Sequence, residues 1–144
     1  MYKRQQHDDE IEILRTSRSG YDSISLNPVA SRAEVAELQA LVPQVFVEDS
    51  LLDFILRIVA ATRTESEFKA GASVRGGIAL RTAAQARALV HGRDFVLPDD
   101  VTEMVPLVLA HRLALARQTG DSLEERRSVG AHLKRILAAL PPPV

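Results

Sequence analysis

The sequence of 144 residues predicts an all-α fold, a compact bundle of about six helices. Apolar residues recur at helical spacing along most of the chain, and only two short stretches, QVFV and RDFVL, look extended. Serine, aspartate or proline stands where several of these helices would begin, and glycine or proline where they would end. The two extended stretches could pair with each other, so one very short two-strand pairing is compatible with the bundle.

Residues that begin or end helices place the individual elements. Ser31 and Glu34 form the capping-box pattern, and Pro43 ends the helix that they begin. Gly92 is a natural C-cap, and Pro98 suits the first position of the next helix. The helices are expected over residues 7–16, 31–42, 49–63, 73–91, 98–117 with a kink near Pro106, and 122–140.

The helix over residues 49–63 should form the centre of the core. Asp53 and Arg57 are the only charges between Leu51 and Thr62, and a helix so apolar is surrounded on most sides. The helix over residues 73–91 is rich in alanine, which lets backbones approach closely. Its packing stripe is predicted to be Ile78, Ala79, Ala83, Ala86 and Val90, with Arg81 and Gln85 facing away.

Composition narrows the function classes. Apolar residues make up 46% and charged residues 26%, an ordinary balance for a folded domain. The net charge is −1 and aromatic residues are 4%, so a nucleic-acid binder is poorly supported. There is no cysteine, which excludes disulfides and thiolate metal sites. No apolar run reaches the roughly 18 residues of a membrane span and no signal-peptide core is seen, so the expected location is the cytoplasm.

Motifs for metal binding or nucleophilic catalysis are also missing. The chain has four histidines, His7, His91, His111 and His132. They stand in separate segments without zinc-ligand spacing, so no metal site is expected. No serine lies in a GxSxG signature.

Arg75, in the stretch GASVRGGIAL, raises the main question about function. It stands in the first turn of the helix over residues 73–91, where the helix dipole is positive and a cation costs roughly 0.3–1 kcal/mol. It also falls on the side of the predicted packing stripe. Its charge is therefore expected to point along a cleft and to need an anion.

Two kinds of anion could satisfy Arg75. One is a carboxylate of the same domain, with Asp99, Asp100 and Glu48 as candidates. The other is an external phosphate, bound by the arginine fork together with the N-terminal amides of the helix. The glycines of the stretch favour the phosphate slightly, because they clear side chains from around an anion. Spacing alone leaves both readings open.

Four stretches resemble MoxR-type AAA+ ATPases. GASVRGGIAL is similar to the sensor-2 segment of that family, Gly-Ala-Ser-x-Arg followed by a small residue. VFVEDSLLDFILRIVAATR resembles the helix that precedes this segment in the family and ends in Thr-Arg. GRDFVLPDDV resembles the element that follows the segment, and VLAHRLAL resembles the Leu-x-His-Arg sequence at the end of that element. Order and spacing agree across residues 43–117. HDDEIEIL also resembles the helix just after the ATPase core, so the resemblance covers about residues 7–140.

The resemblance implies a small α-helical lid subdomain over residues 7–144, in which residues 7–31 form the linking helix and connector from an ATPase core on the N-terminal side. Residues 1–6 look like a junction segment. In this family the nucleotide lies between core and lid. Arg75 is then the expected catalytic sensor-2 arginine, reaching the γ-phosphate of ATP, while the core holds Mg. The implied nucleotide-binding residues are Gly71, Ser73 and Arg75.

The resemblance further implies a ring homo-oligomer, chaperone-like maturation of protein complexes and a von Willebrand factor A-type partner. The chain alone is expected to be inactive, because none of its lysines lies in a Walker A sequence and QVFVED is not a Walker B strand. The alternative function is that of a stand-alone, histone-fold-like helical module, which would bind a protein partner through its apolar surface and need no nucleotide.

Three other positions carry expectations. Leu97 stands where the family usually has a small polar cap, so the helix at Pro98 should be less well capped. Arg63 is expected to satisfy the last carbonyls of its own helix. Arg112 is expected to pair with an internal acid. A neighbouring subunit is the alternative partner of both arginines.

Overall fold

The computed structural model describes residues 11, 15, 27–117 and 120–143. It divides into two units, residues 1–35 and 36–144. The predicted junction over residues 1–6 lies outside the described residues, as do most of the helix over residues 7–16 and the connector after it. Of that helix only Ile11 and Arg15 are described, and both are helical.

Helix α2, Arg32–Leu41, begins with the predicted capping box. The Ser31 amide donates to the Glu34 carboxylate at 2.7 Å, and the Glu34 amide donates to the Ser31 hydroxyl at 3.2 Å. No residue of α2 is buried, and the side chains of Val35 and Leu38 are exposed.

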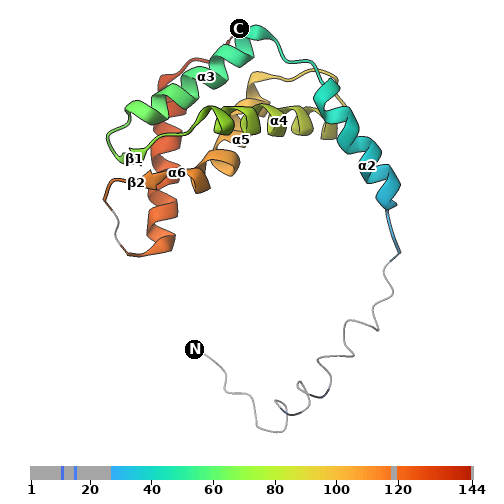
Figure 1. The fold of residues 1–144 in the computed structure, drawn as a ribbon, viewed down its shortest axis with the longest axis horizontal. Helices are drawn as coiled ribbons and strands as arrows, with labels where there is room; N and C mark the ends of the chain where they lie inside the picture. Colours follow the sequence, from blue (N-terminus) through green and yellow to red (C-terminus); the bar gives the residue numbers. More distant parts are fainter. Residues whose placement is uncertain (1–10, 12–14, 16–26, 118–119, 144) are drawn as a thin grey trace. The chain divides into compact units, whose positions relative to one another are not determined.

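The remaining elements confirm the predicted all-α class (Figure 1). Four α-helices and two short 3-10 helices follow, with one pair of very short strands. The α-helices are α3 (Asp49–Thr64), α4 (Val74–Val90), α5 (Pro98–Leu109) and α6 (Ser122–Ala139); the others are η1 (Val42–Gln44), η2 (Ala110–Arg112), β1 (Phe68–Ala70) and β2 (Ala114–Leu115).

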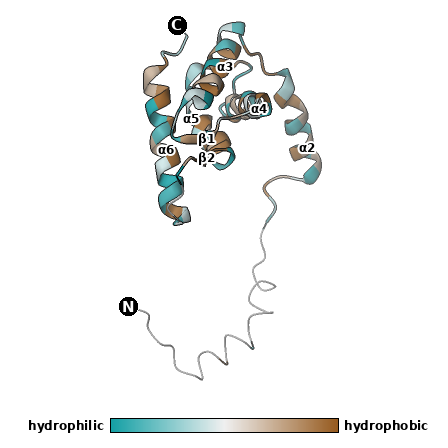
Figure 2. Cartoon of the chain, turned by 60° about the vertical axis from the view of Figure 1, so that its left-hand side comes forward, coloured by the Kyte–Doolittle hydropathy of each residue, from teal (hydrophilic) through white to brown (hydrophobic). Residues whose placement is uncertain are grey.

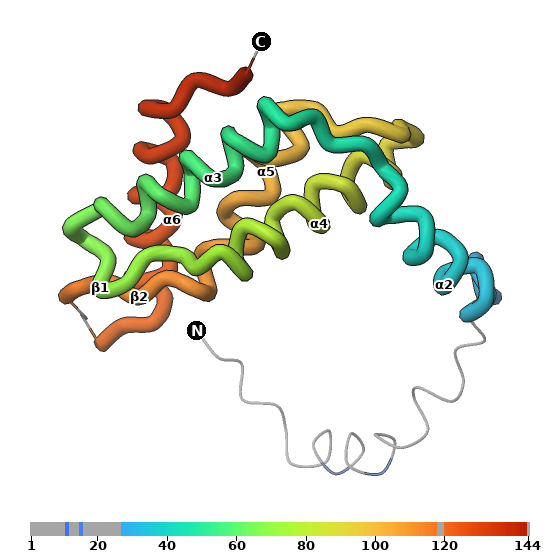
Figure 3. The backbone as a smooth tube through the Cα atoms, turned by 45° about the horizontal axis from the view of Figure 1, so that its top comes forward, coloured from blue at the N-terminus to red at the C-terminus, as the bar shows by residue number. Residues whose placement is uncertain are grey.

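Helices α3 and α4 run antiparallel beside each other, and α5 packs against α4 (Figures 1 and 3). The predicted central role of α3 is confirmed, since Phe54 and Ile58 are completely buried. Helix α6 adds Val129, Leu133 and Ile136 to the same core. Both apolar and polar stretches alternate along each helix in Figure 2, as expected for helices with one face on a shared core.

The predicted pairing of QVFV with RDFVL is present as a single parallel bridge between Phe46 and Phe95. The Phe46 amide donates to the Asp94 carbonyl at 2.8 Å, and the Val96 amide donates to the Phe46 carbonyl at 3.0 Å. A second strand pairing was not predicted from the sequence. Strands β1 and β2 are antiparallel, with Phe68 opposite Leu115.

This second pairing explains why the helix predicted over residues 98–117 is too long. Helix α5 is continuous through Pro106 but ends at Leu109, and η2 follows. The chain then extends so that the Ala116 amide can donate to the Glu67 carbonyl at 2.8 Å. A long-range strand pairing therefore overrides the helical pattern of the last residues.

The predicted packing stripe of α4 was wrong. Ile78 and Val90 are exposed by 55% and 85%. The buried residues are Gly76, Gly77, Leu80, Ala84, Gln85 and Ala88. Small apolar residues of α4 lie on all sides of the helix, so hydrophobic periodicity cannot identify its inner face. The face that packs on α3 and α5 carries mainly glycine and alanine, because small side chains allow the helices to approach closely. Gln85 is buried because its amide group donates to the Val45 carbonyl at 2.7 Å.

Candidate functional site

Arg75 lies in the first turn of α4 with an exposed side chain, not along a cleft as predicted. Within the described part of the chain it makes no ion pair and no hydrogen bond. The structure thus leaves a permanent positive charge at the positive end of a helix without an internal anion. This arrangement is unfavourable for the domain alone.

The N-terminus of α4 also lacks a side-chain cap. Ser73 is the N-cap residue, with φ −81° and ψ 169°, but its side chain makes no capping hydrogen bond. Its carbonyl accepts from the amides of Gly76 and Gly77, at 2.8 and 3.3 Å. The amides of Val74 and Arg75 precede these and have no acceptor within the helix. Both amides and the Ser73 hydroxyl are therefore available to a ligand.

The other described α-helices begin differently. Each carries an acid in its first turn, whereas α4 has none; these acids are Glu34 in α2, Asp49 in α3, Asp99 and Asp100 in α5, and Glu124 and Glu125 in α6. Helix α6 is also capped by Asp121, which accepts from the amides of Leu123 and Glu124. The chain therefore compensates the dipole at four helix starts and not at the helix that carries Arg75.

None of the three candidate carboxylates pairs with Arg75. Asp100 accepts from Arg93 at 2.6 and 2.7 Å and lies 3.3 Å from the Arg87 Nε atom. Burial would raise the pKa of Asp100, but the hydrogen bonds from Arg93 and from the Leu97 amide outweigh it and lower that pKa. Asp99 and Glu48 form no ion pair with Arg75 either.

The start of α5 is held better than expected. Leu97 cannot accept a hydrogen bond through its side chain, but its amide donates to the Asp100 carboxylate at 2.8 Å. Asp100 therefore serves as the reciprocal cap from inside the first turn.

The prediction that Arg63 bonds the last carbonyls of its own helix is wrong. Its Nε atom donates instead to the Ala72 carbonyl at 2.8 Å, in the segment just before α4. The neighbouring Thr62 is fully buried and bonds the same residue, because its hydroxyl accepts from the Ala72 amide at 2.9 Å. The end of α3 and the start of α4 are thus joined directly.

The glycines of GASVRGGIAL are explained by packing. A Cβ atom on Gly71 would lie 2.4 Å from the Arg63 Cα atom, so no other residue fits there without a backbone shift. Gly76 lies against Leu109, and Gly77 against Val59 and Ile55. Clearing space for an anion is therefore not needed to account for them.

The predicted partner of Arg112 is absent among the described residues. Its Nε atom donates to the Val108 carbonyl at 3.1 Å, and no acid pairs with it. The described histidines do not converge either: His132 lies edge-on to the Phe68 ring at 5.7 Å, and His111 is in η2. Across the described ranges, no three His, Asp or Glu side chains are arranged to hold a metal ion.

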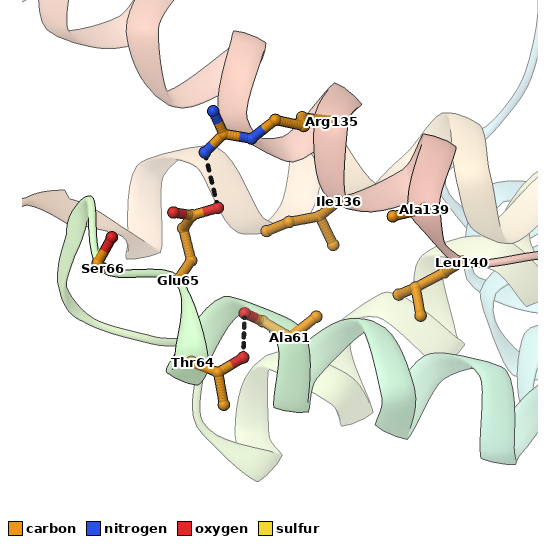
Figure 4. Close-up of a pocket in the computed structure, with 8 residues that line it drawn as sticks. All are labelled: Ala61, Thr64, Glu65, Ser66, Arg135, Ile136, Ala139 and Leu140. Atoms are coloured by element: carbon orange, nitrogen blue, oxygen red, sulfur yellow. Dashed lines mark hydrogen bonds and ion pairs between the residues drawn. The ribbon is translucent and has the colours of Figure 1, made fainter.

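One surface cavity, of about 320 Å³, lies between the end of α3 and α6 (Figure 4). Ile136, Ala139 and Leu140 give it an apolar wall, and Arg135 pairs with Glu65 across it at 2.8 Å. The Arg135 hydrogen bond lowers the pKa of Glu65. Another groove, of about 220 Å³, lies between α3 and α4 and is lined by Val74 and Ile78 from the first turns of α4. Neither cavity brings together groups that could perform covalent chemistry.

Comparison with known proteins identifies the domain. The family model described as AAA lid domain matches residues 60–130, which include the Thr62–Ala72 contact and Arg75. The chaperone MoxR1 of Mycobacterium tuberculosis is 35% identical over 145 aligned residues, 93% of this chain. The chain belongs to the AAA lid domains of MoxR-type AAA+ proteins.

Two other proteins are similar to this lid domain. The Bacillus subtilis protein YeaC is 38% identical over 107 residues, 74% of the chain and 33% of YeaC. The crystal structure of a candidate ATPase from Cytophaga hutchinsonii aligns with 99% of the chain at a TM-score of 0.70 and 25% identity. The chain spans 37% of MoxR1 and 45% of the Cytophaga chain, so it corresponds to less than half of each of these relatives.

Each described helix of the lid domain is too short or too polar to cross a membrane.

Proposed function

We propose that this chain is the lid of a MoxR-type ATPase that closes over ATP and supplies Arg75 as the sensor-2 arginine. In that role the guanidinium would contact the γ-phosphate and stabilise the negative charge that develops as the terminal phosphoryl group is transferred. The ATPase core on the N-terminal side would hold most of the nucleotide together with Mg. The lid alone would not hydrolyse ATP.

The observation that carries the proposal is the unsatisfied cation at an uncapped helix start. Arg75 has no anionic partner in the described residues, and α4 has no acid in its first turn. An external phosphate would supply the missing negative charge to both the arginine and the helix dipole. A carboxylate of the lid would have done so permanently, and the described structure offers none.

The surrounding residues suit a phosphate. The Ser73 hydroxyl and the first amides of α4 are donors without an acceptor in the lid. Gly71 would contribute by geometry, because its lack of a side chain lets the segment before α4 lie directly on Arg63. Donors fixed in this way stabilise developing charge without having to reorganise during the reaction.

Contact between Arg75 and the terminal phosphate would also make the position of the lid depend on the bound nucleotide, since ADP lacks that group. We further propose that the complete protein forms a ring in the cytoplasm and acts as a chaperone-like factor in the maturation of protein complexes, with a von Willebrand factor A-type partner. The name of the relative MoxR1, a chaperone, supports the chaperone-like part of this proposal.

The test is an Arg75→Ala substitution in the complete ATPase that contains this lid. We expect turnover to fall about 100-fold or more, in the range seen when a charge-stabilising donor is removed, while the unfolding midpoint is kept. Arg81→Ala is the control, because Arg81 is an exposed arginine on the same helix. Unchanged turnover in folded Arg75→Ala protein would contradict the proposal and favour a helical interaction module that needs no nucleotide.

A further inference from the structure

Thr62 and Arg63, near the end of α3, form hydrogen bonds with the segment that precedes α4. Thr62 is a fully buried polar residue, with 0% of its surface exposed. Its hydroxyl donates to the Val59 carbonyl at 2.7 Å and accepts from the Ala72 amide at 2.9 Å. Donor and acceptor are both used, so the hydroxyl has one defined orientation.

Arg63 completes the attachment of Ala72. Its Nε atom donates to the Ala72 carbonyl at 2.8 Å, so both backbone polar groups of Ala72 are held by consecutive side chains of α3. Gly71 fits against the Arg63 backbone, where even a methyl group would overlap. Three contacts therefore fix two adjacent residues of the connecting segment against the end of α3.

These contacts lie directly upstream of Arg75. Ala72 is itself buried, 2% exposed, and α4 begins two residues later at Val74. A Cβ atom on Gly76, in the first turn, would lie 3.4 Å from the Ala72 methyl group. Fixing Ala72 therefore fixes where the first turn of α4 starts. The arginine side chain itself makes no hydrogen bond or ion pair with the described residues.

We propose that Thr62 and Arg63 are positioning residues for Arg75: they hold the Gly71-Ala72 segment so that the arginine and the free amides of α4 face the phosphate in one geometry. This inference rests on the proposed function of Arg75. Because an error of about 1 Å in such a group can cost on the order of 100-fold in rate, the buried hydroxyl of Thr62 would affect catalysis without touching ATP.

The experiment is a double-mutant cycle in the complete ATPase with Thr62→Val, Arg75→Ala and both together. Valine keeps the shape of threonine and removes only the hydroxyl. We expect Thr62→Val to lower kcat roughly 10- to 100-fold, with the KM for ATP changed less than about twofold, since misplacement is felt in the transition state. In the Arg75→Ala background the same change should have no further effect.

Three companion variants give the cycle its controls. Thr62→Ser keeps the hydroxyl and should hydrolyse ATP at close to the wild-type rate, unlike Thr62→Val. Arg63→Met keeps the apolar stem, loses the Nε donor and should repeat the effect of Thr62→Val. Thr64→Val removes the hydroxyl of an exposed threonine on the same helix, which donates only to the Ala61 carbonyl at 3.2 Å, and should leave turnover unchanged. Unfolding midpoints above the assay temperature would show that each variant is folded.

The outcomes separate the two proposals. If Arg75→Ala lowers turnover but folded Thr62→Val and Arg63→Met do not, the positioning role is wrong and the sensor role stands. If Thr62→Val lowers turnover equally in both backgrounds, Thr62 acts on folding or on another site, and the positioning role is also wrong. If Arg75→Ala has no effect, the sensor role fails and the positioning role fails with it.

Discussion

Arg93 donates to both carboxylate oxygens of Asp100, at 2.6 and 2.7 Å. The same carboxylate accepts from the Leu97 amide, and Arg87 approaches it from α4. The Asp100 side chain is only 2% exposed. One buried carboxylate therefore connects the end of α4, the segment around the Phe46–Phe95 bridge and the start of α5. The GRDFVLPDDV stretch is in this way a structural junction.

Asp100→Asn should destabilise the chain. The asparagine amide has only one oxygen, so it cannot accept the hydrogen bonds from both terminal nitrogens of Arg93. Arg93 would also lose the carboxylate that neutralises its charge. We therefore expect a loss of roughly 2–4 kcal/mol in the free energy of unfolding. Denaturant unfolding of the 144-residue chain measures it. Asp99→Asn is the control, since the neighbouring Asp99 side chain is exposed and forms no ion pair. Equal effects of both substitutions would contradict the assigned role of Asp100.

The contribution of the Asp100 contacts to stability should decrease in acid. The pKa of Asp100 in the folded chain lies below its ordinary value of 3.8, because Arg93 and the Leu97 amide stabilise the charged form against the opposing effect of burial. Its contribution to stability is then fully present above about pH 5 and is lost as the pH falls through the folded-state pKa. The difference in unfolding free energy between wild type and Asp100→Asn should be constant from neutral pH down to about pH 5 and shrink below it. A difference that grows on acidification would contradict the lowered pKa.

Two glycines of the GASVRGGIAL stretch should respond in opposite directions to alanine. Gly71→Ala should cost roughly 1–3 kcal/mol, because its methyl group would overlap the Arg63 backbone. Gly77→Ala should stabilise the chain by about 0.5–1 kcal/mol, because glycine is unfavourable inside a helix. Its methyl group would lie at ordinary contact distances of 3.5 and 3.6 Å from Val59 and Ile55. Thermal unfolding of both variants compares them, and a destabilised Gly77→Ala would show that α3 and α4 are already in closest contact.

The bundle could be predicted because its helix boundaries are encoded locally. The residues that begin or end these helices affect only the backbone within one turn of themselves. The structure places each of the predicted ones at a helix end: Ser31 with Glu34, Ser73, Pro98 and Gly92. Gly92 has φ +71°, the conformation that favours glycine at a helix C-terminus. The β1–β2 pairing was missed because it joins residues far apart, and FKA and AL are too short to show a strand period.

The candidate site was predicted only in part. The position of Arg75 at a helix start followed from Ser73 and the helical spacing, but its exposure did not, since an alanine-rich helix gives no periodic signal for its inner face. The use of Asp100 by Arg93 and Arg87 could not be read from residue types. The hydrogen bond between Thr62 and Ala72 was not predicted, because it depends on how the segment between α3 and α4 folds back.

Arg75→Ala should leave the stability of the 144-residue chain unchanged or raise it slightly. The side chain is exposed and makes no ion pair in the described residues, so little is lost. Removing a cation from the positive end of a helix should contribute a few tenths of a kcal/mol in favour of folding. Denaturant unfolding measures this, with Arg81→Ala as the control for replacing an exposed arginine further along the helix, where the dipole effect has faded. A clear loss of stability in Arg75→Ala would mean that the arginine has a structural partner. A neutral or positive change combined with lost turnover in the complete ATPase would show that the cation is kept at this position for its ligand, at a cost to the fold.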